Sequence, residues 1–164
     1  MLQATTDRPS PRGSARAAAL RALAARRLTE TQLWERLTRK GFADGTIRDA
    51  IEMCKRDGYV DDALFAQLYV DGRRKAVGDS RLVAELVKRG IDRDAAQASV
   101  MRAAQSEDTR IEVAIESLYR RRPELGYPNA ARALERLGFP APSIYRHLRA
   151  RAAAEFEDCE QSRS

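Results

Sequence analysis

Apolar residues recur along this chain at three- and four-residue intervals, the spacing that places them on one face of an α-helix. The clearest instance returns three times: two Leu four places apart, a Gly four places later, and then a large apolar residue. The copies are Leu33-Leu37-Gly41-Phe42, Leu82-Leu86-Gly90-Ile91 and, with Ala in the first place, Ala130-Leu134-Gly138-Phe139. Their glycines lie 49 and 48 residues apart, so the pattern predicts a tandem array of similar helical units.

The first unit is expected to contain three helices. The first runs from Ser14 to about Arg26, with an inward face of Ala17, Leu20, Leu23 and Ala24. Thr29-Glu30-Thr31-Gln32 is a capping box that predicts the start of the second helix, and Gly41 ends it because glycine adopts a positive φ without steric cost. Asp44 is expected to cap the third helix, whose inward residues are Ile47, Ala50, Ile51 and Cys54.

The second and third units follow the same plan. In the second unit, Asp61 or Asp62 is expected to cap the first helix and Asp92 the last, with Gly78-Asp79 leading into the middle helix. The inward residues of that first helix are predicted to be Leu64, Phe65, Leu68 and Tyr69. In the third unit Asn129 is expected to cap the middle helix. The inward residues of the last helix are expected to be Ile144, Leu148 and Phe156.

The fold class predicted is therefore all-α, an elongated, solenoid-like array of three three-helix repeat units. The 164 residues contain only 9 Gly and 6 Pro, a composition that favours helix throughout. The expected divisions are a disordered N-terminal tail over 1–13, repeats over 14–58, 59–106 and 107–154, and an acidic C-terminal tail over 155–164.

Charge divides the chain into a basic body and an acidic end. The net charge is +6, but residues 155–164 carry four acids and one base, so the remainder carries +9. A basic body attracts polyanions, of which nucleic acid is the usual one. The alternative is that an Arg-rich helical protein simply keeps a solvated surface, and net charge alone does not decide between the two.

Several features that are absent from the sequence indicate the cellular compartment of the protein and argue against catalytic or metal chemistry. The two cysteines, Cys54 and Cys159, fit neither a disulfide framework nor a metal site, which favours a reducing compartment. No apolar run approaches the roughly 18 residues of a membrane span, and the N-terminus lacks a secretion signal, so we expect a cytoplasmic protein. The one histidine, His147, has no metal-ligand spacing, and Asp61-Asp62 is better explained as a helix cap than as a catalytic pair. We therefore predict a protein that is not an enzyme, without catalytic residues, metal or cofactor.

Cations gather at corresponding places in the three units. Runs of them close the first helix of each unit, and others precede each repeated glycine. Such clusters can follow a phosphate backbone. The alternative is that cations collect at helix C-termini because of the dipole alone, which explains the runs of three less well since like charges repel. The candidate binding residues are Arg26, Arg27, Arg39, Lys40, Arg73, Arg74, Lys75, Arg81, Lys88, Arg89, Arg120, Arg121, Arg122, Arg132 and Arg136.

One segment carries a family resemblance. Gly58-Tyr59-Val60-Asp61-Asp62-Ala63-Leu64-Phe65-Ala66-Gln67-Leu68-Tyr69-Val70 resembles the central signature of the RecX family, regulators of the RecA recombinase. The stretches Leu23 to Leu33 and Leu37 to Phe42 resemble the first repeat of that family, and Gly78 to Ile91 resembles the second. The resemblance runs from about Ala15 to Leu148 and is weakest in the third unit, where Leu137 stands in the place of a cation.

The resemblance implies a curved, all-helical protein that binds in the groove of the RecA–DNA filament. It also implies inhibition of RecA ATP hydrolysis and strand exchange, by capping or disassembly of the filament, with effects on recombination, DNA repair and the SOS response. We expect a monomer that binds single- or double-stranded DNA weakly and without sequence preference, and no membrane. Two alternatives stay open: a helix-turn-helix DNA-binding protein or transcription regulator, and an adaptor with no link to nucleic acid.

Overall fold

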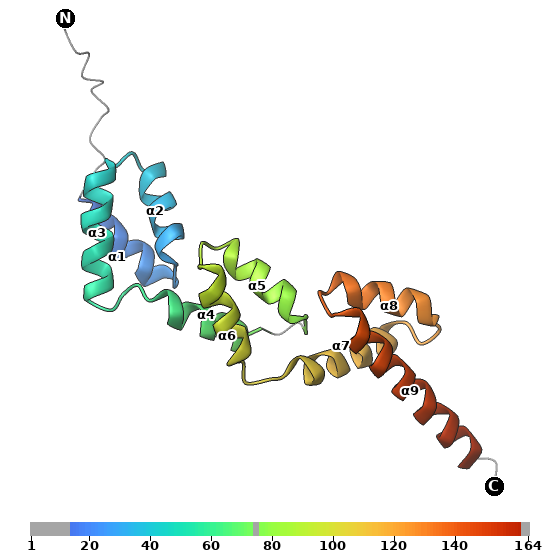
Figure 1. The fold of residues 1–164 in the computed structure, drawn as a ribbon. Helices are drawn as coiled ribbons and strands as arrows, with labels where there is room; N and C mark the ends of the chain where they lie inside the picture. Colours follow the sequence, from blue (N-terminus) through green and yellow to red (C-terminus); the bar gives the residue numbers. More distant parts are fainter. Residues whose placement is uncertain (1–13, 74–75, 162–164) are drawn as a thin grey trace, which may run out of the picture.

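The structure, a computed structural model, describes residues 14–73 and 76–161, and within the last stretch it omits the side chains of 155 and 157–161. Nine helices and no strand occur in these residues, so the predicted all-α class is confirmed. The helices form three successive groups of three arranged in a row (Figure 1). They are α1 (Ala15–Ala25), α2 (Glu30–Arg39), α3 (Asp44–Arg56), α4 (Asp62–Asp71), α5 (Asp79–Val87), α6 (Arg93–Met101), α7 (Glu107–Arg121), α8 (Tyr127–Arg136) and α9 (Ala141–Gln161).

Each group of helices has a small apolar core of its own. The repeated leucines lie at the centre of these cores, with Leu33, Leu37, Leu82, Leu86 and Leu134 almost completely buried. The three repeated glycines turn the chain after the middle helices α2, α5 and α8, at φ values of 83°, 86° and 87° for Gly41, Gly90 and Gly138. The repeat pattern therefore predicted both the core and the turns correctly.

The capping predictions succeed in part. Thr29 and Gln32 form the predicted capping box, and Asp61 and Asp92 cap α4 and α6. Two predicted caps are wrong. Asp44 is the first residue of α3 after Ala43, which makes no side-chain cap. The helix α8 begins at Tyr127, before Asn129, because Pro128 fits the first turn of a helix, where no intrahelical N–H bond is needed.

The inward face of α1 differs from the predicted one. The buried residues are all alanines, namely Ala15, Ala18, Ala19 and Ala22, whereas Ala24 is exposed and Leu20 and Leu23 are half-buried. A face of small side chains lets α1 lie close against α3, so the larger leucines lie at the edges of the contact. Spacing alone predicted a face of leucines and missed the requirement for close approach.

The inward face of α4 also differs from the predicted one. Ala66 and Val70 are buried and Phe65 and Tyr69 are half-buried, but Leu64 and Leu68 are 43% and 44% exposed. The inward prediction for these two leucines is wrong because α4 is apolar on all its faces, and a period of 3.6 residues cannot then choose the face that packs on α6.

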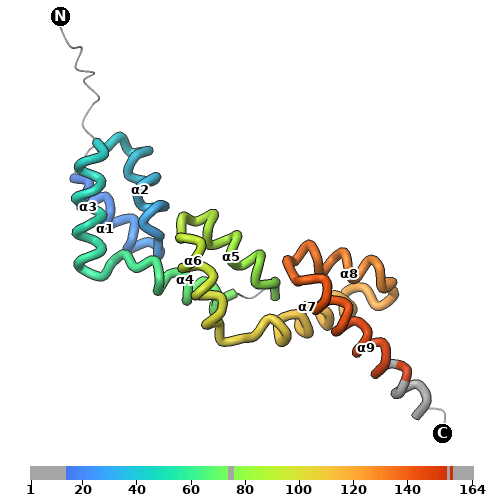
Figure 2. The backbone as a smooth tube through the Cα atoms, in the orientation of Figure 1, coloured from blue at the N-terminus to red at the C-terminus, as the bar shows by residue number. Residues whose placement is uncertain are grey.

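The last helix extends beyond the third core. Ile144 and Leu148 are buried as predicted, but Phe156 is 70% exposed, so its predicted inward position is wrong. Figures 1 and 2 show α9 projecting away from α7 and α8 toward the C-terminus. The helix continues to Gln161 and so includes most of the segment expected to form an acidic tail.

The three groups are connected by two joints of the same design. At the first joint, the N-terminal end of α2 contacts the turn after α5: the Thr29 hydroxyl donates to the Arg89 carbonyl over 2.6 Å, and the Thr31 hydroxyl to the Gly90 carbonyl over 3.4 Å. At the second joint, the N-terminal end of α5 contacts the turn after α8, where the Ser80 hydroxyl donates to the Gly138 carbonyl over 2.6 Å.

A carboxylate from the next unit completes each joint. The Glu30 N–H, at the start of α2, donates to Asp62 over 2.9 Å, and the Asp79 N–H, at the start of α5, donates to Glu107 over 2.7 Å. Asp62 and Glu107 are each the first residue of the first helix in the following unit. The middle helices are therefore related head to tail by repeated contacts, and matching positions recur along the array.

Candidate functional site

The cations of the second unit gather around one carboxylate. Glu85 on α5 accepts hydrogen bonds from the Tyr69 hydroxyl over 2.6 Å and from Arg73 over 2.8 Å, and it also pairs with Arg81 at 3.2 Å. Arg89 stacks over the Tyr69 ring, with its guanidinium carbon 4.3 Å from the ring centre. Three positive charges thus surround a single negative one, and the cluster keeps an excess of positive charge.

The electrostatics of this cluster follow from its contacts. Burial acts to raise the pKa of Glu85, but the hydrogen bonds from Tyr69 and Arg81 and the charge of Arg73 outweigh it, so the pKa lies below its ordinary value. Burial, together with the hydrogen bond to Glu85, raises the pKa of Tyr69. At neutral pH the carboxylate is charged and the phenol is protonated, as the hydrogen bond between them requires.

Arg81 also joins the cluster to the third unit. Its guanidinium donates to the backbone carbonyl of Arg136 over 2.7 Å, across the second joint. Of the candidate binding residues, the structure thus brings together Arg73, Arg81 and Arg89 in one cluster and connects them with Arg136.

The other candidate cations that the structure describes have solvent-exposed side chains, and Arg136 contacts the cluster only through its backbone carbonyl. Arg39 donates to the Glu35 carbonyl on its own helix, and Arg120 pairs with Glu116 one turn earlier, while Arg74 and Lys75 lie outside the described residues. A shallow hollow of about 410 Å³ is lined by Arg120 with Tyr119, Arg151, Glu116 and Pro123. The exposed candidates are Arg26, Arg27, Arg39, Lys40, Lys88, Arg120, Arg121, Arg122, Arg132 and Arg136.

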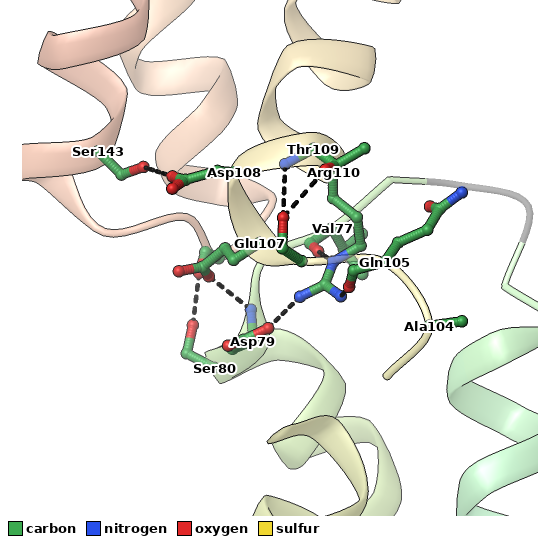
Figure 3. A network of polar contacts seen from close by, with 12 residues as sticks. Val77, Asp79, Ser80, Ala104, Gln105, Glu107, Asp108, Thr109, Arg110 and Ser143 are labelled. Carbon is green, nitrogen blue, oxygen red and sulfur yellow. Dashed lines mark hydrogen bonds and ion pairs between the residues drawn. The ribbon is translucent and has the colours of Figure 1, made fainter. Parts of the chain in front are cut away.

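Arg110 is a buried structural part of the second joint that the sequence interpretation missed. This buried guanidinium donates to the Val77 carbonyl over 3.1 Å and to the Gln105 carbonyl over 2.6 Å, and it forms an ion pair with Asp79 (Figure 3). The available signal was its position one turn before Ala114 on the apolar stripe of α7, where a charged residue needs partners.

The exposed leucines of α4 are a second feature that was missed. Leu64 and Leu68 lie one turn apart and present apolar side chains to solvent in the middle of the array.

The groups considered for catalysis have structural partners. His147 is half-buried, its Nδ1 lies 2.8 Å from the Ser143 carbonyl oxygen, and Asp61 caps α4. In the part of the chain that the structure describes, no three His, Cys, Asp or Glu residues are grouped closely enough to hold a metal ion. None of the described helices is long and apolar enough to cross a bilayer.

These features define the class: an all-α repeat protein made of three-helix units with polar joints and a cationic surface. The model of the first three-helix domain of RecX matches residues 15–54, and the model of the second matches 61–100. The chain is 36% identical over 153 residues to the regulatory protein RecX of Thermobifida fusca, covering 86% of this chain and 80% of that protein. The chain therefore belongs to the RecX family.

A second relative agrees with this assignment, and a solved structure agrees with the fold. The regulatory protein RecX of Mycobacterium avium is 39% identical over 92 residues, which are 55% of this chain and about half (53%) of that protein. The crystal structure of RecX from Lactobacillus salivarius is similar in fold, with a TM-score of 0.72 at 20% identity, covering 83% of this chain and 93% of the other.

Proposed function

We propose that this protein binds along the RecA–DNA filament and inhibits RecA ATP hydrolysis and strand exchange, and that it thereby modulates recombination, DNA repair and the SOS response. Membership of a family whose relatives are named regulatory proteins supports a regulatory role. The central signature, whose resemblance implies RecA as the target, covers most of α4 and includes Tyr69, which contacts Arg73 and Arg89 of the cationic cluster.

The observation that carries the proposal is the repetition of the joint. The Thr31 hydroxyl donates to the Gly90 carbonyl after α5 as the Ser80 hydroxyl donates to the Gly138 carbonyl after α8. Asp62 and Glu107 cap the preceding middle helices in the same way. A repeated joint gives the units matching orientations, so equivalent cations recur along the array. Recurring cations suit a partner that is itself a repeating polyanion, such as a filament on DNA.

The chemistry proposed is binding alone. The side chains considered for catalysis cap helices or hold backbone carbonyls, and the family name supports regulation. Inhibition then follows from occupation of the filament by one molecule that contacts several RecA subunits, through capping or disassembly. The exposed Leu64 and Leu68 on α4 would contact RecA, and the cations would contact acidic protein groups or DNA phosphates.

The test is the rate of RecA ATP hydrolysis on single-stranded DNA as this protein is added. We expect inhibition that increases with its concentration, with weak DNA binding of its own that salt abolishes and that shows no sequence preference. An unchanged ATPase rate at every ratio of the two proteins would contradict the proposal. Sequence-selective duplex binding that persists in high salt would instead support a transcription regulator.

A further inference from the structure

Two tyrosines of the third unit stack on each other at its surface. Tyr127 is the first residue of α8 and Tyr145 lies in the second turn of α9. Their ring centres are 6.2 Å apart and the ring planes are within 18° of parallel. The residues are nevertheless 37% and 42% exposed, so the pair presents flat aromatic surface to solvent.

The other tyrosines in helices are already covered. Arg89 and Phe65 lie against the Tyr69 ring, and Arg151 lies 4.5 Å from the centre of the Tyr119 ring. Among the described residues, no cation stacks on either member of the Tyr127–Tyr145 pair. The pair also lies outside the apolar core of the third unit, whose buried members are Ile111, Ala114, Ile115, Ala130, Ala131, Leu134, Phe139, Ile144 and Leu148.

Positive charge adjoins this aromatic pair. Arg149 is exposed, lies one turn after Tyr145 on α9, and forms no ion pair with any described residue. The N-terminus of α8, where Tyr127 lies, is the positive end of a helix dipole. The corresponding ends of α2 and α5 are capped by Asp62 and Glu107, whereas no described carboxylate accepts from the Tyr127 N–H.

We propose that the Tyr127–Tyr145 pair is a stacking platform for unpaired bases of single-stranded nucleic acid, with Arg149 and the free end of α8 next to the phosphates. Every base has an aromatic face, so stacking of this kind tolerates any sequence. A duplex hides those faces in its own stack, which restricts the platform to single strands. The inference rests on the proposed function and extends it from the filament to its DNA strand.

The test uses the full chain without RecA and compares two fluorescently labelled strands of equal length, one of thymidines and one abasic. Both carry the same phosphates, so their difference in affinity reports contact with bases. We expect wild type to bind the thymidine strand more tightly, and Tyr127→Ala or Tyr145→Ala to reduce that preference by about 5- to 150-fold for each stacked base. Phenylalanine at either position retains the ring and should retain the preference.

Tyr59→Ala is the matched control, because Tyr59 is 58% exposed and is not part of a stacked pair, and thermal unfolding verifies that each variant is folded. Equal wild-type affinity for the two strands, or a preference that survives both alanine variants, would overturn the platform. RecA ATPase inhibition measured in parallel separates the two proposals. If wild type inhibits the RecA ATPase but shows no base preference, the stacking platform is refuted and the proposed function stands. If the tyrosine variants lose ATPase inhibition but keep the base preference, the pair contacts a protein partner instead.

Discussion

The Thr29 hydroxyl donates a hydrogen bond of 2.6 Å to the backbone carbonyl of Arg89, sixty positions further along the chain. The same oxygen accepts from the Gln32 N–H over 3.1 Å, so one completely buried hydroxyl both caps α2 and forms part of the first joint. One side chain therefore contributes both to local helix capping and, with Thr31 and Asp62, to the arrangement of the first two units. The proposed fit of the array to a filament depends on such joints.

The second joint can be tested at Gly78. A Cβ at this position would lie 2.1 Å from the Gly138 carbonyl oxygen, while the backbone of Gly78 is one that any residue adopts, with φ at −73°. We expect Gly78→Ala to separate the second and third units at a cost of about 1–3 kcal/mol in unfolding free energy, the usual range for overpacking. Small-angle scattering should show a changed overall shape.

Gly41→Ala is the control for that experiment. Gly41 has a positive φ of 83°, but a Cβ there would meet no described atom within 4 Å. The variant should lose about 1–2 kcal/mol from backbone strain and keep the wild-type scattering profile. If Gly78→Ala also kept that profile, the close approach of Gly78 to Gly138 would be refuted.

Asp62 tests the first joint. Burial raises the pKa of its carboxyl, against the lowering effect of the hydrogen bond from the Glu30 N–H, and the Glu30 charge raises it further. We expect Asp62→Ala to cost about 0.5–2 kcal/mol in unfolding free energy, the usual range for a lost helix cap. Asp62→Asn keeps an oxygen acceptor and removes the half-buried charge, so it should retain most of that stability. If both variants lost the same unfolding free energy, the hydrogen bond from the Glu30 N–H would not be the source of the stabilisation.

The lowered pKa of Glu85 predicts how the unfolding free energy depends on pH. Its pKa is depressed in the folded protein, so its contribution is fully present above the ordinary value of 4.5 and disappears as pH falls through the folded value. The difference in unfolding free energy between wild type and Glu85→Gln should therefore be constant near neutrality and shrink on acidification below about pH 5. Asp71, whose pKa is also lowered, is present in both proteins and cancels. A difference that is independent of pH would contradict the charged cluster.

The features that the sequence predicted are those set by neighbouring residues. The Thr29–Gln32 capping box and the turn at Gly41 need only residues within a few positions, and both are present. The exposure of the α4 face that carries Leu64 could not be predicted, because α4 is apolar on more than one face and its packing on α6 determines which face is buried. The joint between Thr29 and Arg89 was also invisible, since nothing local indicates a contact sixty positions away.

In the candidate site, too, the sequence identified residues but not the contacts that tertiary packing creates between them. Arg73 and Arg89 were identified as cations, but their gathering at Tyr69 and Glu85 required the tertiary fold that brings side chains of α4 and α5 into contact. Arg110 was missed because two of its partners are backbone carbonyls, which have no sequence signature, and the third, Asp79, lies 31 positions away in the chain.

The run Arg120-Arg121-Arg122 tests whether binding depends on the position of charge. All three side chains are exposed, so the triple alanine variant should keep its helix content by circular dichroism and bind the RecA–DNA filament more weakly. Alanine at the equally exposed Arg16, Arg21 and Arg48 removes the same charge elsewhere and is the matched control. Equal weakening by both triples would indicate a response to net charge alone, and unchanged binding of the first would show that the run is a solvated helix end.

The most direct test of the account is inhibition of RecA ATP hydrolysis on single-stranded DNA by wild type, Gly41→Ala and Gly78→Ala, each at concentrations where it is folded. We predict that wild type and Gly41→Ala inhibit alike and that Gly78→Ala, whose units no longer meet at Gly138, inhibits less. The account is contradicted if wild type leaves the ATPase rate unchanged, or if Gly78→Ala inhibits fully while scattering shows that its joint has opened.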